Sequence, residues 1–335
     1  MHQQGTLLLG NDNSFIYFHI YYSTSNSKYR HLQQFWGASG DFWESAWARI
    51  CDLLGNNEFH IAVTGTVIFS FTVFALANTF FICVDLLGWP KFAKKYKIQP
   101  DEEVKIADFW KAARVALFNL FVVGYPAMMF YYYLFKWRGN SFGPELPTFH
   151  YVLGELIIFT IVEEFGFYYS HRLVYFFVVF DILRFFRKLY RLVHTPLLYK
   201  RIHKKHHEWT APIGIVSIYA HPVEHFVSNL TPVFLGPFIT GAHLATFWLW
   251  IAMALVNTTI SHSGYHLPFL PSAEAHDFHH LKFVNCFGVL GILDRLHGTD
   301  NIFRKSKQYQ RHFLFFSLTP PREMVPDEPK CKKSE

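Results

Sequence analysis

Charged side chains are scarce in this sequence. Asp, Glu, Lys and Arg make up 17% of its 335 residues, whereas a soluble globular domain carries roughly 25%. Hydrophobic residues make up 51% and aromatic residues 19%, including 38 phenylalanines and 18 tyrosines. This balance argues against a soluble globular enzyme. It favours helices that face lipid, with aromatic side chains near the membrane surfaces.

Cysteine is also scarce, and its pattern excludes two common uses. The four cysteines lie far apart and form no CxxC pair: Cys51, Cys83, Cys286 and Cys331. Neither a disulfide framework nor a cysteine-ligated zinc site is therefore expected. The first thirty residues contain no basic stretch followed by an apolar run. We therefore expect no cleaved signal peptide, and membrane insertion depends on internal segments.

The net charge of +6 would by itself suit binding to nucleic acid. The lysines and arginines, however, lie mostly in short stretches beside apolar segments, as in residues 91–97 and 200–205. That placement is typical of the cytosolic loops of membrane proteins rather than of a phosphate-binding surface. We therefore expect no nucleic-acid partner.

Long apolar runs are present in several places. Residues 61–84 form a run of 24 residues without a charge, and residues 115–135 form a second one. Each is long enough to cross about 30 Å of hydrocarbon as a helix. Residues 226–241 and 243–261 are also free of charge, and a Gly-Ala break separates them. This pair predicts a helical hairpin that dips into the bilayer.

A third candidate span, residues 147–171, differs because it carries Glu155, Glu163 and Glu164. Carboxylates within a membrane usually face the protein interior or an aqueous cavity. Glu164 precedes His171 by seven residues, which places the two on nearly the same helix face. These glutamates either line a site or mark where the helix reaches the membrane surface.

The sequence therefore predicts an all-α integral membrane protein with about four to five transmembrane or re-entrant helices. It contains no internal repeat, low-complexity tract or βαβ alternation. We expect four parts: an N-terminal polar region (1–60), membrane helices with a basic loop (61–145), a histidine-rich domain (146–319) and a C-terminal tail (320–335).

The histidines are grouped by spacing as well as by number. Fourteen of the twenty fall between His171 and His297. The motifs HKKHH and HDFHH each place three histidines at positions i, i+3 and i+4, and HSGYH places two at i and i+4. On helices these offsets direct the imidazoles to one face. With two single histidines, these motifs give ten candidate ligands for two metal ions: His171, His194, His203, His206, His207, His262, His266, His276, His279 and His280.

Neutral imidazole suits iron, zinc, copper and nickel. A structural zinc site is closed by four ligands, so ten histidines exceed what one such site needs. A pair of iron ions with open coordination positions suits the activation of O2. We therefore expect two iron ions, with zinc as a substitute. Glu164 and the HPVEH histidines, His221 and His225, are expected to orient ligands by hydrogen bonds. For the HPVEH pair, direct ligation or packing are the alternatives.

Six motifs, in this order, resemble the fatty acid hydroxylase/sterol desaturase superfamily, and especially its 4-methylsterol oxidase-like branch. They are FYYSHR, YKRIHKKHHEWTAPIG, YAHPVEH, SHSGYHLPFLP, HDFHHLKF and LDRLHGTD. The resemblance covers roughly residues 91–319. It implies an endoplasmic reticulum enzyme whose histidine cap faces the cytosol and holds two metals. It also implies electrons from NAD(P)H through cytochrome b5 or its reductase, as a separate donor.

The sequence departs from the family pattern at one place. Where the family has a second histidine four or five residues after the first, this chain has Tyr175, and the expected continuation begins only at His194. Residues 175–193 therefore read as an insert. Its charges recur at helical spacing, which predicts an amphipathic helix at the membrane surface. Whether His194 reaches the metals is left open by the sequence.

The leading functional hypothesis is a di-iron, O2-dependent monooxygenase that oxidises a sterol methyl group, with a membrane lipid or sterol as its substrate. Two alternatives remain: hydroxylation or desaturation of a fatty acyl or sphingoid chain, and a non-catalytic membrane regulator that keeps the fold. The C-terminal Lys332-Lys333-Ser334-Glu335 resembles a dilysine retrieval signal. It agrees with the endoplasmic reticulum membrane and a cytosolic C-terminus.

Overall fold

The computed structural model of the chain describes residues 27–176 and 203–327. His194, most of the predicted insert and the dilysine tail lie outside these ranges. Within them the structure is helical, and the one pairing of extended backbone is an isolated bridge between Lys97 and Tyr265. The prediction of an all-α membrane protein is confirmed.

The chain divides into two compact units, Met1–Trp43 and Glu44–Glu335. Helix α1 (Ser27–Leu53) crosses this boundary and lies in the predicted N-terminal polar region. All elements that carry the candidate site belong to the second unit.

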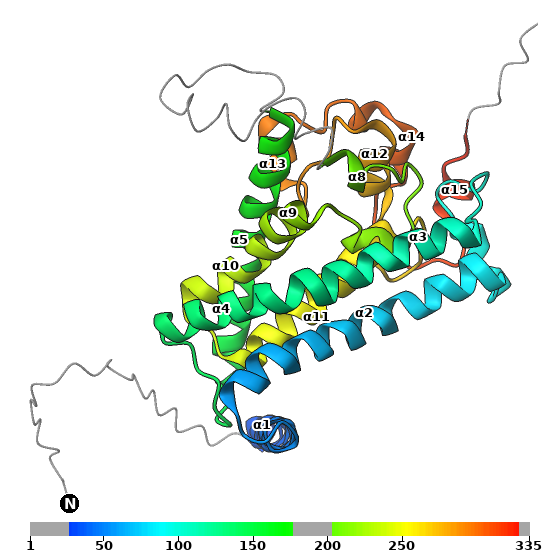
Figure 1. Ribbon diagram of the computed structural model, residues 1–335. Coiled ribbons are helices and arrows are strands. Elements are labelled where there is room, and N and C mark those ends of the chain that lie inside the picture. The colour runs from blue at the N-terminus through cyan, green and yellow to red at the C-terminus, as the bar shows by residue number, and fades with distance from the viewer. Residues whose placement is uncertain (1–26, 177–202, 328–335) are drawn as a thin grey trace, which may run out of the picture. The chain divides into compact units, whose positions relative to one another are not determined.

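Three helices of the second unit are long and apolar enough to cross a membrane: His60–Leu87, Ile106–Arg138 and Leu244–His262. The first contains η1 (His60–Gly65), α2 (Thr66–Ile82) and η2 (Cys83–Leu87). The second contains α3 (Ile106–Leu117), η4 (Phe118–Val123) and α4 (Gly124–Arg138), and the third is α11. These helices confirm the predicted apolar runs, and Figure 1 shows them running alongside one another.

Two of the three long helices end at glycines that adopt the left-handed backbone conformation. Gly88 (φ 68°) ends the first long helix, and Gly139 (φ 87°) ends the second. A glycine just beyond the last turn is the commonest helix terminator, because a residue without Cβ adopts positive φ at little cost. Gly241 (φ 73°) plays the same part at the end of α10 (Thr231–Thr240), and α10 and α11 are the two helices of the predicted hairpin.

Helix α5 (Phe149–Phe176) packs along α10 (Thr231–Thr240) and the preceding η6 (His225–Leu230). The two helices approach closely because the contact contains a glycine. A Cβ on Gly236 would lie 2.8 Å from the Cα of Phe159, a separation that packed atoms do not reach. This contact fixes the position of α5, and with it the positions of Glu163, Glu164 and His171.

Short helices form a polar region beyond one end of the long helices. We call residues 203–221 and 263–327 the histidine cap. Its elements are α8 (His203–His206), η5 (Gly214–Ile218), α12 (Glu274–Lys282), α13 (Ile292–His297), η7 (Phe303–Lys305), α14 (Lys307–Arg311) and α15 (Pro321–Met324). The short α9 (Pro222–Glu224) leads from the cap into η6. Figure 1 shows α8, α12, α13 and α14 gathered together.

The basic loop with η3 (Lys91–Tyr96) ties the first long helix to the cap. The backbone N–H of His266 donates to the carbonyl of Tyr96 at 2.9 Å, and that of Ile98 donates to Gly264 at 2.9 Å. The Tyr265 hydroxyl donates to Asp85 at 2.7 Å. These bonds fix the direction in which the chain leaves α11.

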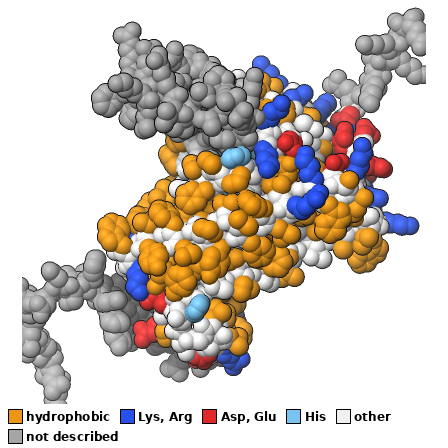
Figure 2. Space-filling model, viewed as in Figure 1, with side chains coloured by type: hydrophobic (Ala, Val, Ile, Leu, Met, Phe, Trp, Pro, Cys, Tyr) orange, Lys and Arg blue, Asp and Glu red, His pale blue; other side chains and the backbone are white. Residues whose placement is uncertain are grey.

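The surface reflects this division. Figure 2 shows hydrophobic side chains over the long helices and Lys and Arg side chains gathered beside the cap. Large apolar residues of the long helices are exposed, among them Leu76 (69%) and Val122 (56%). A continuous apolar surface of this kind suits contact with lipid and is unfavourable in water.

Candidate metal centre

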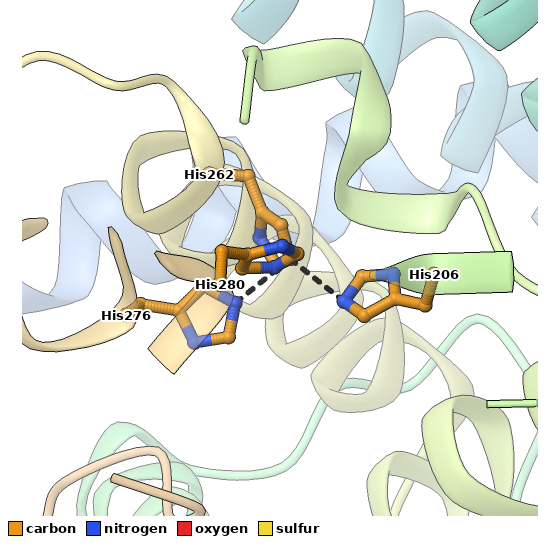
Figure 3. A group of neighbouring side chains, drawn as sticks. All are labelled: His206, His262, His276 and His280. Atoms are coloured by element: carbon orange, nitrogen blue, oxygen red, sulfur yellow. Dashed lines mark hydrogen bonds between the residues drawn. The ribbon is translucent and has the colours of Figure 1, made fainter. Parts of the chain in front are cut away.

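Four imidazoles converge where α8, α11 and α12 meet. One ring nitrogen of each of His206, His262, His276 and His280 lies within 4.8 Å of the others (Figure 3). His276 and His280 are one turn apart on α12, while His206 and His262 are the last residues of α8 and α11. The Nε2 atom of His262 lies 2.8 Å from Nε2 of His276 and 3.4 Å from Nε2 of His206.

Three further imidazoles continue this cluster. The rings of His207 and His279 have centroids 4.8 Å apart, and those of His171 and His279 are 5.6 Å apart. His207 joins them to the first group through His280, at 5.0 Å. Seven of the ten predicted ligands thus form one continuous group of rings, a group of four beside a group of three. Such a set offers donor atoms for two adjacent ions.

Backbone carbonyls orient four of these rings. In each case Nδ1 lies at hydrogen-bonding distance from a carbonyl oxygen: His206 to Tyr219 at 2.9 Å, His262 to Thr258 at 2.8 Å, His279 to Asn285 at 2.7 Å and His280 to Trp209 at 2.9 Å. A carbonyl only accepts, so Nδ1 donates and Nε2 keeps its lone pair. This arrangement is typical of histidines that ligate a metal through Nε2.

The site fits a cation on these grounds. With Nδ1 protonated, the Nε2 lone pairs of His206 and His262 face each other at 3.4 Å. No described residue hydrogen-bonds to the buried Nε2 of His280. Burial and the neighbouring imidazoles hold the pKa of His276 and of His280 well below its usual value. The rings are therefore neutral near pH 7, and a metal ion would satisfy their converging lone pairs.

The structure brings His266 to a different place. Its Nε2 donates to the carbonyl of Phe313 at 3.0 Å, and its Nδ1 lies 3.6 Å from the carboxylate of Glu274. Its ring contacts Phe313 and Phe315. His266 thus packs against the C-terminal part of the cap. His203 is the first residue of α8, but its side chain and all of His194 lie outside the described part of the chain.

The residues expected to orient ligands occupy three different environments. The Nδ1 of His221 accepts from the backbone N–H of Val223 at 3.3 Å and so caps α9. His225 is buried, with Asn229 Nδ2 at 3.4 Å from its Nδ1, and it lines a cavity next to the metal centre.

Glu164 binds the backbone of the cap. Its carboxylate accepts from the backbone N–H groups of Val289, Leu290 and Leu293 at 2.9, 2.7 and 3.1 Å. A Cβ on Gly288 would lie 2.9 Å from the same carboxylate, so only glycine leaves this approach open. Glu164 therefore anchors the loop before α13 to α5.

Two cavities adjoin at the metal centre. The first has a volume of about 130 Å³ and lies among the long helices, and its lining is mainly apolar, including Val67, Leu120 and Phe234. The second has a volume of about 230 Å³ and lies in the cap, with Asp294 and His312 in its lining. The arrangement gives an apolar molecule a place beside the histidines, with polar surroundings on the other side.

Sequence reasoning missed a support for His206. Asn119 is fully buried in η4, and its side-chain Nδ2 donates to the carbonyls of Ile218 and Ala220 at 2.8 and 2.9 Å. These two residues flank Tyr219, whose carbonyl orients His206. A signal was present in the sequence, because an amide inside a predicted apolar span needs a buried partner.

Comparison with known proteins agrees with this site. The family model described as "Fatty acid hydroxylase" matches residues 173–299. Fatty acid hydroxylase domain-containing protein 2 of Homo sapiens is 47% identical over 307 residues, covering 91% of this chain and 86% of that protein. No solved structure matches this chain.

Two plant relatives have more specific names. Methylsterol monooxygenase 2-2 of Arabidopsis thaliana is 31% identical, covering 79% of this chain and 95% of the relative. Very-long-chain aldehyde decarbonylase GL1-8 of Oryza sativa subsp. japonica is 32% identical, covering 79% of this chain and 93% of the relative. The motifs, the histidine cluster and these relatives agree. The chain is a membrane protein of oxidoreductase type that belongs to the fatty acid hydroxylase/sterol desaturase superfamily.

Proposed function

We propose that this protein is a di-iron, O2-dependent monooxygenase that oxidises a methyl group of a sterol, as a 4-methylsterol oxidase does. The observation that carries the proposal is the group of seven imidazoles beside an apolar cavity that lies among membrane-spanning helices. The methylsterol monooxygenase relatives are the reason for proposing a sterol as the substrate.

His206, His262, His276 and His280 would hold one iron ion, and His171, His207 and His279 would contribute to the second. When bound, such a pair supplies O2 activation: one oxygen atom enters a C–H bond, and two electrons and two protons convert the other to water. The electrons come from NAD(P)H through a separate cytochrome b5 or its reductase.

The chain's own contribution is position and exclusion of water. The carbonyls of Tyr219, Thr258, Asn285 and Trp209 hold four rings with Nε2 directed into the cluster. This pre-organised geometry avoids rearrangement when a metal or substrate binds. The apolar lining of the first cavity admits hydrocarbon and disfavours water. A lipid therefore reaches the centre from the bilayer side.

The cap faces the cytosol, and the enzyme resides in the endoplasmic reticulum membrane with its C-terminus on the same side. The basic side chains beside the cap support this orientation, since cytosolic loops carry an excess of Lys and Arg. Protease digestion of intact microsomes tests it. A tag at residue 335 should be removed, and protection of that tag would contradict the orientation.

The activity test uses membranes that contain the full chain, NADH, cytochrome b5 and its reductase. We expect a supplied 4-methylsterol to gain oxygen at the methyl group, as detected by mass spectrometry, and His280→Ala to abolish this conversion. Hydroxylation of ceramide or acyl lipid in place of the sterol would support the acyl or sphingoid alternative. Two bound metals without oxidation of any of these lipids would support a non-catalytic regulator.

A further inference from the structure

The two cavities meet at five residues. Both are lined by the same set: Glu163, Phe167, Ala254, Thr258 and His262. His262 belongs to the metal centre, and the backbone carbonyl of Thr258 orients its ring. Glu163 is thus the one carboxyl at the junction between the apolar cavity, the polar cavity and the histidines.

The Glu163 carboxyl has no partner among the described residues, since no hydrogen bond or ion pair of theirs involves it. Its neighbour Glu164 provides the contrast, because that carboxylate accepts three backbone N–H groups of the cap. The Glu163 side chain is partly buried, and a partly buried carboxyl that makes no hydrogen bond to the protein lowers stability. Its position at the junction of two cavities points to a ligand that supplies the missing donor.

The position of Glu163 determines which part of a ligand it meets. Glu163, Phe167 and His171 follow at intervals of four residues on α5, and all three line the apolar cavity. Two turns of helix separate Glu163 from His171, about 12 Å along the axis. Because Glu163 and His262 of the metal centre both line the two cavities, the carboxyl faces the end of a bound lipid that lies near the metals.

The size of the apolar cavity agrees with this placement. Its volume is about 130 Å³, and an apolar cavity of about 150 Å³ holds one benzene ring. The cavity is thus close to the size of one small ring, so at most one ring of a sterol fits in it. In a 4-methylsterol the ring that bears the reacting methyl group also bears the 3-hydroxyl.

We propose that Glu163 binds the hydrogen-bond donor of a neutral lipid, a hydroxyl carried at the same end of the molecule as the carbon that is oxidised. The choice of a sterol as the lipid rests on the proposed function. The role of Glu163 as an acceptor does not, since the amide N–H of a sphingolipid could donate to it in the same way. A free fatty acid is disfavoured, because its carboxylate would meet a second carboxyl.

The test measures lipid binding, which does not require turnover. The purified full chain in nanodiscs binds a radiolabelled 4α-methylsterol, and competition gives the affinities of the 3β-hydroxy sterol, its 3-deoxy analogue and ceramide. In the wild type we expect the 3-deoxy analogue to bind about tenfold more weakly, as for the loss of one hydrogen bond to a carboxylate. Glu163→Leu should remove this difference.

Two variants control for a general disturbance of the fold. Glu163→Gln keeps the shape and an acceptor oxygen, so it should retain part of the preference for the hydroxyl. Glu155→Gln replaces a buried carboxyl of the same helix that lines neither cavity, and it should leave the preference unchanged. If Glu163→Leu does not fold, the inference is still tested by the preference of the wild type for the hydroxy sterol over the deoxy sterol and by the reduction of that preference in Glu163→Gln.

The outcomes separate this inference from the proposed function. The inference is overturned if two results occur together: the wild type binds the hydroxy and deoxy sterols equally, and Glu163→Leu leaves the binding of ceramide unchanged. A preference for the hydroxyl that Glu163→Leu does not change also overturns it. If the protein binds ceramide but not sterol, and this binding depends on Glu163, the inference is supported and the proposal of a sterol substrate fails.

Discussion

The long apolar helices and the histidine cap differ in what holds each of them in place. Helices α2 and α11 pack against each other through apolar side chains and expose others to the membrane. In the cap, single hydrogen bonds to backbone carbonyls define the positions of the His206, His279 and His280 rings. Exchanges between apolar residues on the lipid-facing surface should therefore be tolerated. The loss of one polar contact in the cap should change the metal centre.

The largest effect is expected for His280→Ala. The His280 ring is fully buried and contacts the rings of His206, His207, His262 and His279, among others. Removing it should lower metal content below half of the wild-type value and reduce lipid oxidation by about a hundredfold or more, because the group of four loses a member and the group of three loses the ring that joins it to the other group. Elemental analysis of the purified chain measures the metal.

The matched comparison is His266→Ala, which removes a predicted ligand that the structure places against Phe313 and Glu274. We expect it to keep most of the metal and to lower the temperature of thermal unfolding. If His266→Ala loses as much metal as His280→Ala, the separation of His266 from the cluster is wrong.

The next effect tests how a spanning helix supports the cap. Asn119→Leu removes the two hydrogen bonds that hold the backbone on either side of Tyr219. Because the Tyr219 carbonyl orients His206, we expect metal affinity to fall by about ten- to a hundredfold, the usual effect of removing a group that supports a metal ligand. Titration with a metal chelator measures this affinity.

Asn140→Leu is the control for Asn119→Leu. Asn140 is also buried, and its Nδ2 donates to the carbonyls of Pro237 and Ala242, among residues that line neither cavity at the metal centre. It should lower stability to a similar extent without lowering metal affinity. Equal metal loss in both variants would mean that Asn119 acts through the fold alone.

A moderate effect is expected for Glu164→Gln. An amide in place of the carboxylate keeps one acceptor oxygen, so its NH2 group faces either the backbone N–H of Leu293 or those of Val289 and Leu290, from which it cannot accept a hydrogen bond. The free energy of unfolding should fall by about 1–3 kcal/mol, as seen in the thermal unfolding of the detergent-solubilised protein. Glu163→Gln, one residue away, should leave this temperature nearly unchanged. A larger decrease in unfolding temperature for Glu163→Gln than for Glu164→Gln would contradict the roles assigned to the two glutamates.

The smallest effect is expected for Lys111→Ala. Lys111 in α3 forms an ion pair with Glu208 of the cap at 2.7 Å, and both side chains are about half exposed. An exposed pair contributes less than about 1 kcal/mol, and salt weakens it further. Thermal unfolding at low and high salt should show a small difference that disappears in high salt. A large shift would mean that the two regions depend on this surface contact.

Much of the fold could be predicted from the sequence because apolar runs of sufficient length have few alternatives to membrane-spanning helices. The runs at residues 61–84 and 115–135 are helical, and the runs at 226–241 and 243–261 form helices that a short break at residues 241–243 separates. The spacing of HDFHH likewise indicated which histidines share a face. His276 and His280 illustrate this, since the i and i+4 rule alone places them together.

The remaining features depend on contacts between distant segments. His262 and His266 have the same spacing, but Ser263 and Gly264 end the helix between them, and His266 turns toward Phe313. The sequence singled out Glu164, because it shares a helix face with His171, whereas the structure places Glu163 at a cavity and Glu164 against a loop more than a hundred residues away. Local periodicity carries no information about such partners.

The most direct test of the central claim is X-ray absorption spectroscopy at the iron edge on the purified full-length protein. The account predicts two iron ions per chain, a first shell of nitrogen and oxygen, and outer-shell scattering from several imidazoles. A chain that binds a single metal, or a first shell with sulfur at about 2.3 Å, the metal–sulfur distance of zinc thiolates, would contradict a di-metal centre held by histidine.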